Sequence, residues 1–156
     1  MEITIRRAHP GDASRLTEIA RLAKAHWGYP AAWLALWAAD LAVSPEFIER
    51  NLVSCAASGE RLVGFYALRM YGRTAELEHL WVHPDAMGRG IGRALFEHAA
   101  RESKSRGAGE VKIVSDLNDE AFYRHMGARR VGEQDSVPAG RRLPVLVYAP
   151  GNVEPR

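Results

Sequence analysis

The segment from Ala75 to Leu95, AELEHLWVHPDAMGRGIGRAL, carries the strongest structural signal in the chain. Its first part is rich in apolar residues, as in a strand, and Pro84 ends that strand because proline has no amide hydrogen to donate to a sheet. Three alternating glycines follow, at Gly88, Gly90 and Gly92, and apolar residues at helical spacing come directly after them. The segment therefore predicts a strand, a glycine-rich loop and the start of a helix.

A glycine-rich loop ahead of a helix favours binding of an anion. The backbone N–H groups at a helix N-terminus lack partners inside the helix, and the helix dipole attracts negative charge. The nucleotide P-loop does not match, because this loop ends in Gly92-Arg93-Ala94 with no hydroxyl for magnesium. The dinucleotide fingerprint does not match either, because the spacing is GxGxG and the loop lies in mid-chain. We expect another phosphate-bearing ligand, with a purely structural turn as the alternative.

The composition predicts a single soluble domain. The chain has 156 residues, of which 47% are hydrophobic and 26% charged, and its formal charge of +2 is too small to indicate nucleic acid or membrane partners. The single cysteine, Cys55, lies in an apolar run, so it predicts a buried structural thiol and excludes an internal disulfide. Neither a signal-like N-terminus nor an apolar span of about 18 residues occurs, so we expect a cytoplasmic protein.

Hydrophobic periodicity along the rest of the chain predicts both helices and strands. The expected strands are residues 3–6, 53–57, 62–71, 74–82, 111–114, 128–132 and 143–149, with a turn-rich segment at 133–142. The expected helices are residues 10–25, 30–41, 45–51, 120–126 and the one from the glycine loop to Ser105. Consecutive strands followed by a crossover helix predict a mixed α/β (α+β) fold, with a mostly antiparallel central sheet flanked by helices. We assign this domain to residues 1–150 and a C-terminal tail to 151–156.

Two segments together resemble the GNAT superfamily of acyl-CoA-dependent N-acetyltransferases. The first is VHPDAMGRGIGRAL at 82–95, and the second is SDLNDEAFYRHMGARRVG at 115–132, which is similar to the family's second cofactor segment. The resemblance implies a GNAT-like fold, acetyl-CoA as co-substrate, no metal, and transfer of the acetyl group to a primary amine. Where the family's loop begins with Gln or Arg, this chain has Met87. A non-catalytic acyl-CoA-binding module is the alternative function.

The resemblance also implies which residues hold the cofactor. The family's loop binds the pyrophosphate mainly through backbone amides, and the strand before it pairs with the pantetheine arm. The implied cofactor-binding residues are Leu80, Trp81, Val82, Met87, Gly88, Arg89, Gly90, Ile91, Gly92, Arg93 and Asn118. For Asn118 a role as helix N-cap is an equally good interpretation.

An amine nucleophile must lose its proton before it attacks a thioester. With a pKa near 10.4, only about 0.1% of a lysine-like amine is neutral at pH 7, which costs roughly 4–5 kcal/mol. Glu76 and Glu78 are two apart on a strand and so point to one face. The resemblance implies Glu78 as the catalytic base, with Glu76 as second choice, and Tyr123 as the acid that protonates the leaving sulfur. The alternatives are solvent-facing or ion-paired glutamates and a tyrosine that anchors its helix by packing.

The two histidines beside these glutamates do not predict a metal site. His79 and His83 are four apart, but they lie on a strand and a turn rather than on one helix. His79 follows Glu78 directly and is a candidate to line the active site.

The acceptor is expected to be a small-molecule or peptide amine. An aromatic-rich region after the first strand holds Trp27, Tyr29, Trp33 and Trp37, which suits a pocket for an amine. Core packing or a contact in a homodimer explains these residues at least as well.

Overall fold

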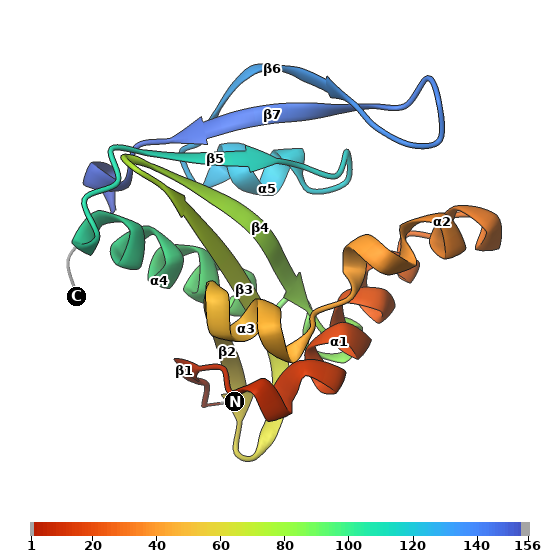
Figure 1. The fold of residues 1–156 in the computed structure, drawn as a ribbon, viewed down its shortest axis with the longest axis horizontal. Helices are drawn as coiled ribbons and strands as arrows, with labels where there is room; N and C mark the ends of the chain where they lie inside the picture. Colours follow the sequence, from red (N-terminus) through yellow and green to blue (C-terminus); the bar gives the residue numbers. More distant parts are fainter. Residues whose placement is uncertain (1, 154–156) are drawn as a thin grey trace. The chain divides into compact units, whose positions relative to one another are not determined.

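The computed structural model describes residues 2–153 (Figure 1). The strands are β1 (Thr4–Arg7), β2 (Leu52–Ser58), β3 (Arg61–Tyr71), β4 (Thr74–Val82), β5 (Glu110–Val114), β6 (Arg129–Asp135) and β7 (Arg142–Tyr148). The α-helices are α1 (Ala13–Ala25), α2 (Ala31–Leu41), α3 (Pro45–Arg50), α4 (Ile91–Ser105) and α5 (Glu120–His125). Short 3₁₀ helices are η1 (Pro10–Asp12), η2 (Pro84–Ala86) and η3 (Pro150–Asn152).

The strands form a seven-stranded sheet in the order β1-β2-β3-β4-β5-β7-β6. β4 pairs with β5 in parallel, whereas β1 with β2, β5 with β7 and β6 with β7 pair antiparallel. The predicted mixed α/β fold with a mostly antiparallel sheet is confirmed. The predicted helices and strands are confirmed too, within two or three residues at each end.

Contacts divide the chain into two compact units, which are described separately. Unit 1 runs to Ala67 and includes residues 79–96, and unit 2 comprises residues 68–78 and the chain from Glu97 onward.

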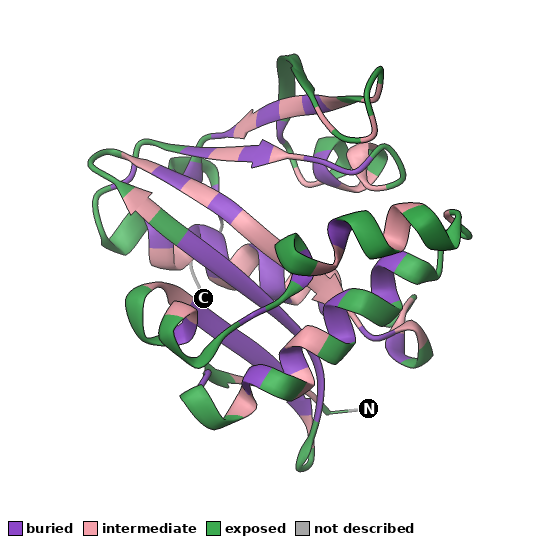
Figure 2. Cartoon of the chain, turned by 45° about the vertical axis from the view of Figure 1, so that its right-hand side comes forward, coloured by how far each residue is buried: buried purple, intermediate pink, exposed green. Residues whose placement is uncertain are grey.

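The core of unit 1 forms because α1 is amphipathic. Leu16, Ile19 and Ala20 fall on one helical face and are fully buried, together with Val53 of β2 and Phe65 of β3. Figure 2 shows long buried stretches along β2 and β3 and buried residues at intervals along α1. The hydrophobic pattern in the sequence thus decides which face of α1 covers the sheet.

The start of α3 has an N-cap. The Ser44 hydroxyl accepts a hydrogen bond from the Phe47 amide at 3.0 Å, and Pro45 occupies the first helical position. The Ser44 hydroxyl therefore satisfies an amide of the first turn, and Pro45 sets the backbone angle there.

Gly64 on β3 allows α4 to lie close to the sheet. A Cβ atom at this position would come within 2.9 Å of the Trp81 carbonyl oxygen and 3.0 Å of the Leu95 Cδ1. Since Leu95 is fully buried, the first turns of α4 pack against β3 and the end of β4 only because residue 64 has no side chain. The sequence analysis did not single out Gly64.

In unit 2, β5 lies between β4 and β7. Its register with β4 runs from Thr74 opposite Glu110 to Leu77 opposite Ile113. Gly107, which has a φ of 85°, follows the C-terminal end of α4, where a left-handed glycine commonly ends a helix.

The predicted turn-rich segment at 133–142 is wrong at both ends. β6 continues to Asp135, which pairs with Arg142 at the start of β7, so the connection is only residues 136–141. The Arg142 guanidinium contacts Glu133 at 3.3 Å and Asp135 at 2.6 Å. A polar, exposed hairpin has no apolar alternation to reveal its length, and these cross-strand charge pairs extend it.

The assigned tail at 151–156 lies partly outside the described residues. Within the described part, Pro150 and Val153 are buried and η3 spans Pro150–Asn152. Residues 154–156 lie outside it. Between residues 2 and 153, no helix is both long and apolar enough to cross a membrane.

Candidate active site

The glycine loop of unit 1 is held at its N-terminal side by His83. The His83 Nδ1 accepts a hydrogen bond from the Asp85 amide at 3.1 Å and so caps η2. Gly88 and Gly90 then adopt φ angles of 77° and 79°, a region that other residues rarely enter. Gly92 lies inside α4. Two of the three glycines are therefore required by the backbone of the loop itself.

The loop fits a large phosphate-bearing group. Cβ atoms at Gly88 and Gly90 would meet nothing within 4 Å, so the space beside the backbone is open. The first hydrogen bond of α4 runs from the Ala94 amide to the Gly90 carbonyl oxygen at 3.0 Å, and amides earlier in a helix have no acceptor within it. Ile91 is buried and anchors the loop, whereas Arg89 and Arg93 are exposed. Backbone donors and positive charge thus come together here.

The last residues of β4 lie beyond the part of the strand that pairs with β5. That register ends at Leu77, and the following residues Leu80, Trp81 and Val82 are half-buried. The His83 amide donates to the Val63 carbonyl oxygen of β3 at 2.8 Å, which fixes the point where β4 ends. Met87 follows η2 and is half-buried.

Glu78, in unit 2, is a partly buried carboxylate with a raised pKa. Burial is the main cause, and the nearby Glu76 carboxylate raises the pKa further. The Arg69 guanidinium lies 3.6 Å from Glu78 Oε1, and it lowers the pKa together with Lys112, though by less. Lys112 is directly opposite Glu76 in the β4–β5 register. Both catalytic candidates on this strand therefore have cationic neighbours, but burial dominates at Glu78.

His79, in unit 1, sits in an aromatic environment. Its ring packs against Phe47 and Phe65 with centroid distances of 5.8 and 5.7 Å, and its Nδ1 accepts a hydrogen bond from Trp81 Nε1 at 3.0 Å. Burial lowers the pKa of His79 to about 4, so the ring is neutral at physiological pH.

Tyr123 is buried on α5 in unit 2. Burial is the main cause of a strongly raised pKa, with further contributions from the carboxylates of Asp119 and Asp116. The hydroxyl therefore keeps its proton at any physiological pH. The predicted alternative, an aromatic anchor for α5, is consistent with this burial as well.

Asn118 is exposed and does not cap α5. The N-cap position of α5 is Asp119, and both the backbone amide and the side-chain Nδ2 of Asn118 donate to Asp116 Oδ1, at 2.8 and 2.9 Å. The N-cap interpretation of Asn118 is thus wrong. Asn118 instead belongs to a turn that the buried Asp116 carboxylate holds by these two hydrogen bonds. Arg141 contacts the same carboxylate at 3.4 Å, a pair that the sequence analysis missed because the two residues are far apart in the chain.

The aromatic region after β1 contains its own cation. The Lys24 ammonium lies 4.4 Å from the Trp37 ring centroid and 5.2 Å from that of Tyr29. Tyr29 and Trp33 stack at 6.0 Å, and Trp37 is buried in the core of unit 1. Core packing is therefore confirmed for Trp37, and Lys24 already lies over one face of the Trp37 and Tyr29 rings. Trp27 is exposed.

The remaining reactive candidates play structural roles. Cys55 is buried as predicted, and burial raises the pKa of its thiol to about 11, which disfavours the nucleophilic thiolate. Within residues 2–153, no group of three or more His, Cys, Asp or Glu side chains is arranged to hold a metal ion.

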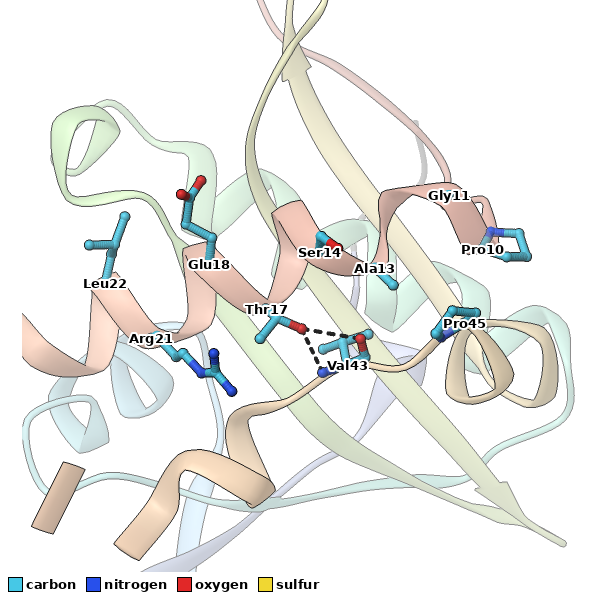
Figure 3. Close-up of a pocket in the computed structure, with 10 residues that line it drawn as sticks. All are labelled: Pro10, Gly11, Ala13, Ser14, Thr17, Glu18, Arg21, Leu22, Val43 and Pro45. Carbon is cyan, nitrogen blue, oxygen red and sulfur yellow. Dashed lines mark hydrogen bonds between the residues drawn. The ribbon is translucent and has the colours of Figure 1, made fainter. Parts of the chain in front are cut away.

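A separate groove of about 670 Å³ lies along α1 in unit 1 (Figure 3). On its floor the Thr17 hydroxyl bridges the amide and the carbonyl oxygen of Val43 at 2.9 and 3.1 Å. Glu18 and Arg21 are among the side chains that line it, and none of the predicted site residues does. This groove is thus distinct from the residues that the sequence nominates.

Comparisons with known proteins agree with this architecture. Streptothricin acetyltransferase of Streptomyces lavendulae is 37% identical over 83 residues, a match that covers 50% of this chain and 43% of that protein. The chain thus matches less than half of that relative's length.

Two solved structures share the fold at low sequence identity. The PaiA N-acetyltransferase of Thermoplasma acidophilum, in complex with coenzyme A, superposes with a TM-score of 0.79 and 23% identity, covering 96% of this chain and 99% of that one. The ribosomal-protein-S18-alanine N-acetyltransferase of Escherichia coli gives a TM-score of 0.72 and 19% identity, over 95% and 94%. Residues 15–128 match the model of the Acetyltransferase (GNAT) family, more than half of the chain, and the chain therefore belongs to this family.

Proposed function

We propose that this chain transfers the acetyl group of acetyl-CoA to a primary amine by direct attack of the amine on the thioester. Membership of the family supports the reaction type. The observation that carries the proposal is Glu78, a partly buried carboxylate with a raised pKa on the strand that leads to the glycine loop.

Glu78 acts as the base in this proposal. A carboxylate becomes a stronger base as its pKa rises towards the working pH, and the position of Glu78 combines burial with a second carboxylate two residues away. Glu78 takes the proton from the ammonium form of the acceptor, directly or through a water molecule. Glu76, which faces Lys112, is the second candidate.

The glycine loop holds the pyrophosphate of the co-substrate. Its amides and the N-terminus of α4 supply hydrogen bonds from Gly88 to Gly92, while Leu80 and Val82 pair through their backbone with the pantetheine arm. Bound acetyl-CoA supplies the activated thioester that the amine attacks. Met87 begins the loop without a polar side chain, so binding depends on the backbone.

Tyr123 stabilises the leaving sulfur. Because burial keeps its hydroxyl protonated, the side chain retains an O–H group that can donate a hydrogen bond. A thiolate has a pKa of about 8.5, well below that of this hydroxyl, so donation of a hydrogen bond contributes more than complete transfer of the proton. As the C–S bond breaks, the attacking nitrogen loses its second proton to become the amide, and this proton neutralises the thiolate, so the free thiol of CoA leaves.

We propose a small-molecule or peptide primary amine as the acceptor. The relatives support a range of acceptors, since one is named for streptothricin and another for an alanine of ribosomal protein S18. A cytoplasmic location and a homodimer remain predictions from the sequence.

Release of free thiol from acetyl-CoA tests the proposal, measured against a panel of small amines, amino acids and peptides. Turnover of at least one amine is the expected result, together with an increase in melting temperature when acetyl-CoA is added. Stabilisation by acetyl-CoA without turnover of any amine would favour the non-catalytic binding module. A melting temperature unaffected by acetyl-CoA would contradict the proposal at its first step.

A further inference from the structure

His79 is the titratable side chain on β4 that the proposed reaction leaves unused. It lies directly after Glu78, and its ring is held on both sides by aromatic groups, Phe47 of α3 and Phe65 of β3. The third contact is the hydrogen bond from the Trp81 indole to its Nδ1, at 3.0 Å. No charged side chain is among these three packing partners.

The bond from Trp81 fixes the tautomer of His79. An indole N–H only donates hydrogen bonds, so Nδ1 must carry the lone pair and the proton of the neutral ring lies on Nε2. Burial lowers the pKa to about 4, which keeps the ring in this neutral form across physiological pH. The only basic nitrogen of the ring is therefore already engaged, and His79 is not the base.

The Nε2–H group is the polar group of the His79 ring that the bond from Trp81 leaves unused. It has no hydrogen-bond partner among residues 2–153, and within that range no fully buried side-chain nitrogen or oxygen atom lacks a partner. The Nε2 atom must therefore reach solvent, although the rest of the ring is packed. An N–H donor in this position recognises an oxygen acceptor.

We infer that His79 is a substrate-positioning residue, which Trp81 holds as the Nε2–H tautomer so that it donates a hydrogen bond to a carbonyl or carboxylate oxygen of a substrate. The inference rests on the proposed acetyl transfer. The oxygen belongs either to acetyl-CoA or to the acceptor amine, and the two are separated by adding them one at a time.

Nuclear magnetic resonance of the imidazole nitrogens tests the tautomer without any turnover. The six histidines of the chain are distinguished by loss of the His79 signals in His79→Phe. We expect the Nε2–H form at every pH from about 5.5 to 8.5, well above the pKa of the ring. Acetyl-CoA alone, or an amine of the panel added together with coenzyme A in place of acetyl-CoA so that no reaction occurs, should shift the Nε2 resonance. An Nδ1–H form, a titration near pH 6.5, or no shift with either substrate would overturn the inference.

Three substitutions distinguish two roles of His79: donating a hydrogen bond to a substrate through Nε2, and accepting one from Trp81 at Nδ1. His79→Gln carries an amide N–H near the Nε2 position, His79→Asn carries an oxygen near the Nδ1 position, and His79→Phe has neither. We expect Phe and Asn to raise the KM of the substrate that shifts the resonance by roughly two- to tenfold, the effect of one hydrogen bond, with Gln close to wild type and the pH profile unchanged. Rescue by Asn and not by Gln would overturn the inference, because support of Trp81 would then be the whole role.

The two proposals fail in different ways. Absence of thiol release on every amine contradicts acetyl transfer, whereas the tautomer and the resonance shift are measured with substrates bound and need no reaction. Normal turnover in all three variants would leave acetyl transfer intact and exclude His79 from substrate positioning.

Discussion

The glycine loop and the strand that precedes it differ in which atoms matter: the backbone in the loop and the side chains on the strand. From Gly88 to Gly90 the loop is exposed, and it depends on backbone angles that only glycine adopts readily. On β4 the side chains differ sharply in their surroundings, since Glu78 has charged neighbours and His79 has aromatic ones. The proposed role of the loop therefore depends on the backbone that its glycines allow. The proposed roles on β4 depend on the surroundings of each side chain.

This difference predicts how substitutions should act in each region. A substitution in the loop acts through the backbone, so almost any side chain should be damaging at a position with positive φ. A substitution on β4 acts through one chemical group, so isosteric replacements should separate charge from shape.

The largest effect is expected from Gly90→Val. A β-branched residue at a φ of 79° costs at least roughly 1–2 kcal/mol, and the loop will change shape to relieve that strain. We expect affinity for acetyl-CoA, measured by calorimetry, to fall by roughly 100-fold or more, since several backbone hydrogen bonds are lost together.

Gly59→Val is the matched control for that substitution. Gly59 has a φ of 63° in the turn between β2 and β3, and a Cβ there also meets nothing within 4 Å. It should lose comparable stability and retain acetyl-CoA binding. Equal loss of binding in both variants would show that strain alone, rather than the position in the loop, is responsible.

Glu78→Gln should have the next largest effect. The amide keeps the shape of the side chain and removes the base, so kcat should fall by roughly 100-fold, the usual contribution of general base catalysis, while acetyl-CoA affinity stays near wild type. Single-turnover thiol release measures the chemical step. Full activity across the pH range would place the base elsewhere, with Glu76 next in line.

The sequence predicted the loop better than the strand, for physical reasons. Glycine at Gly88 and Gly90 reports a backbone requirement directly, and Pro84 and Ser44 mark their element ends in the same local way. The raised pKa of Glu78 depends on burial and on Arg69, which is nine positions away in the chain. No spacing rule contains that information.

The aromatic region shows the same limit. Trp33 and Trp37, four positions apart on α2, have their rings in contact, but Lys24 over the Trp37 ring comes from another helix. The exposed hairpin of β6 and β7 was predicted too short, because its register depends on pairs such as Arg142 with Asp135. Local signals were sufficient for element types, and contacts distant in sequence decided the rest.

Gly64→Ala should reduce stability rather than chemistry. The new methyl group would lie 2.9 Å from the Trp81 carbonyl oxygen, a backbone atom that cannot easily move, so we expect a loss of roughly 1–3 kcal/mol in the free energy of unfolding. Gly132→Ala in β6 is the control, because a Cβ there meets nothing within 4 Å and φ is not positive. Urea denaturation measures both. Equal stability in the two variants would show that α4 does not need the close approach at Gly64.

The smallest effect, and the sharpest test of the strand, is a pair of opposite shifts in the pH profile. In the proposed reaction deprotonated Glu78 is the active form, so the rate of thiol release should fall as the pH drops through its raised pKa. Glu76→Gln removes a like charge and should move this acidic limb to lower pH, whereas Arg69→Gln removes a cation and should move it to higher pH. One acceptor amine serves for all variants, so its own titration is common to them.

The same carboxylate gives a second, independent measurement. Because the pKa of Glu78 is raised in the folded protein, the folded state holds that proton more tightly than the unfolded chain does. Its contribution to stability therefore declines as the pH rises from the unfolded-state pKa through the folded-state pKa, and Glu78→Gln should remove that decline. If neither Glu76→Gln nor Arg69→Gln moves the kinetic limb while Glu78→Gln still flattens the stability curve, Glu78 titrates but is not the base. The environment of Glu78 on β4 would then affect stability only, and acetyl-CoA binding by the loop would be the remaining proposed role of this part of the chain.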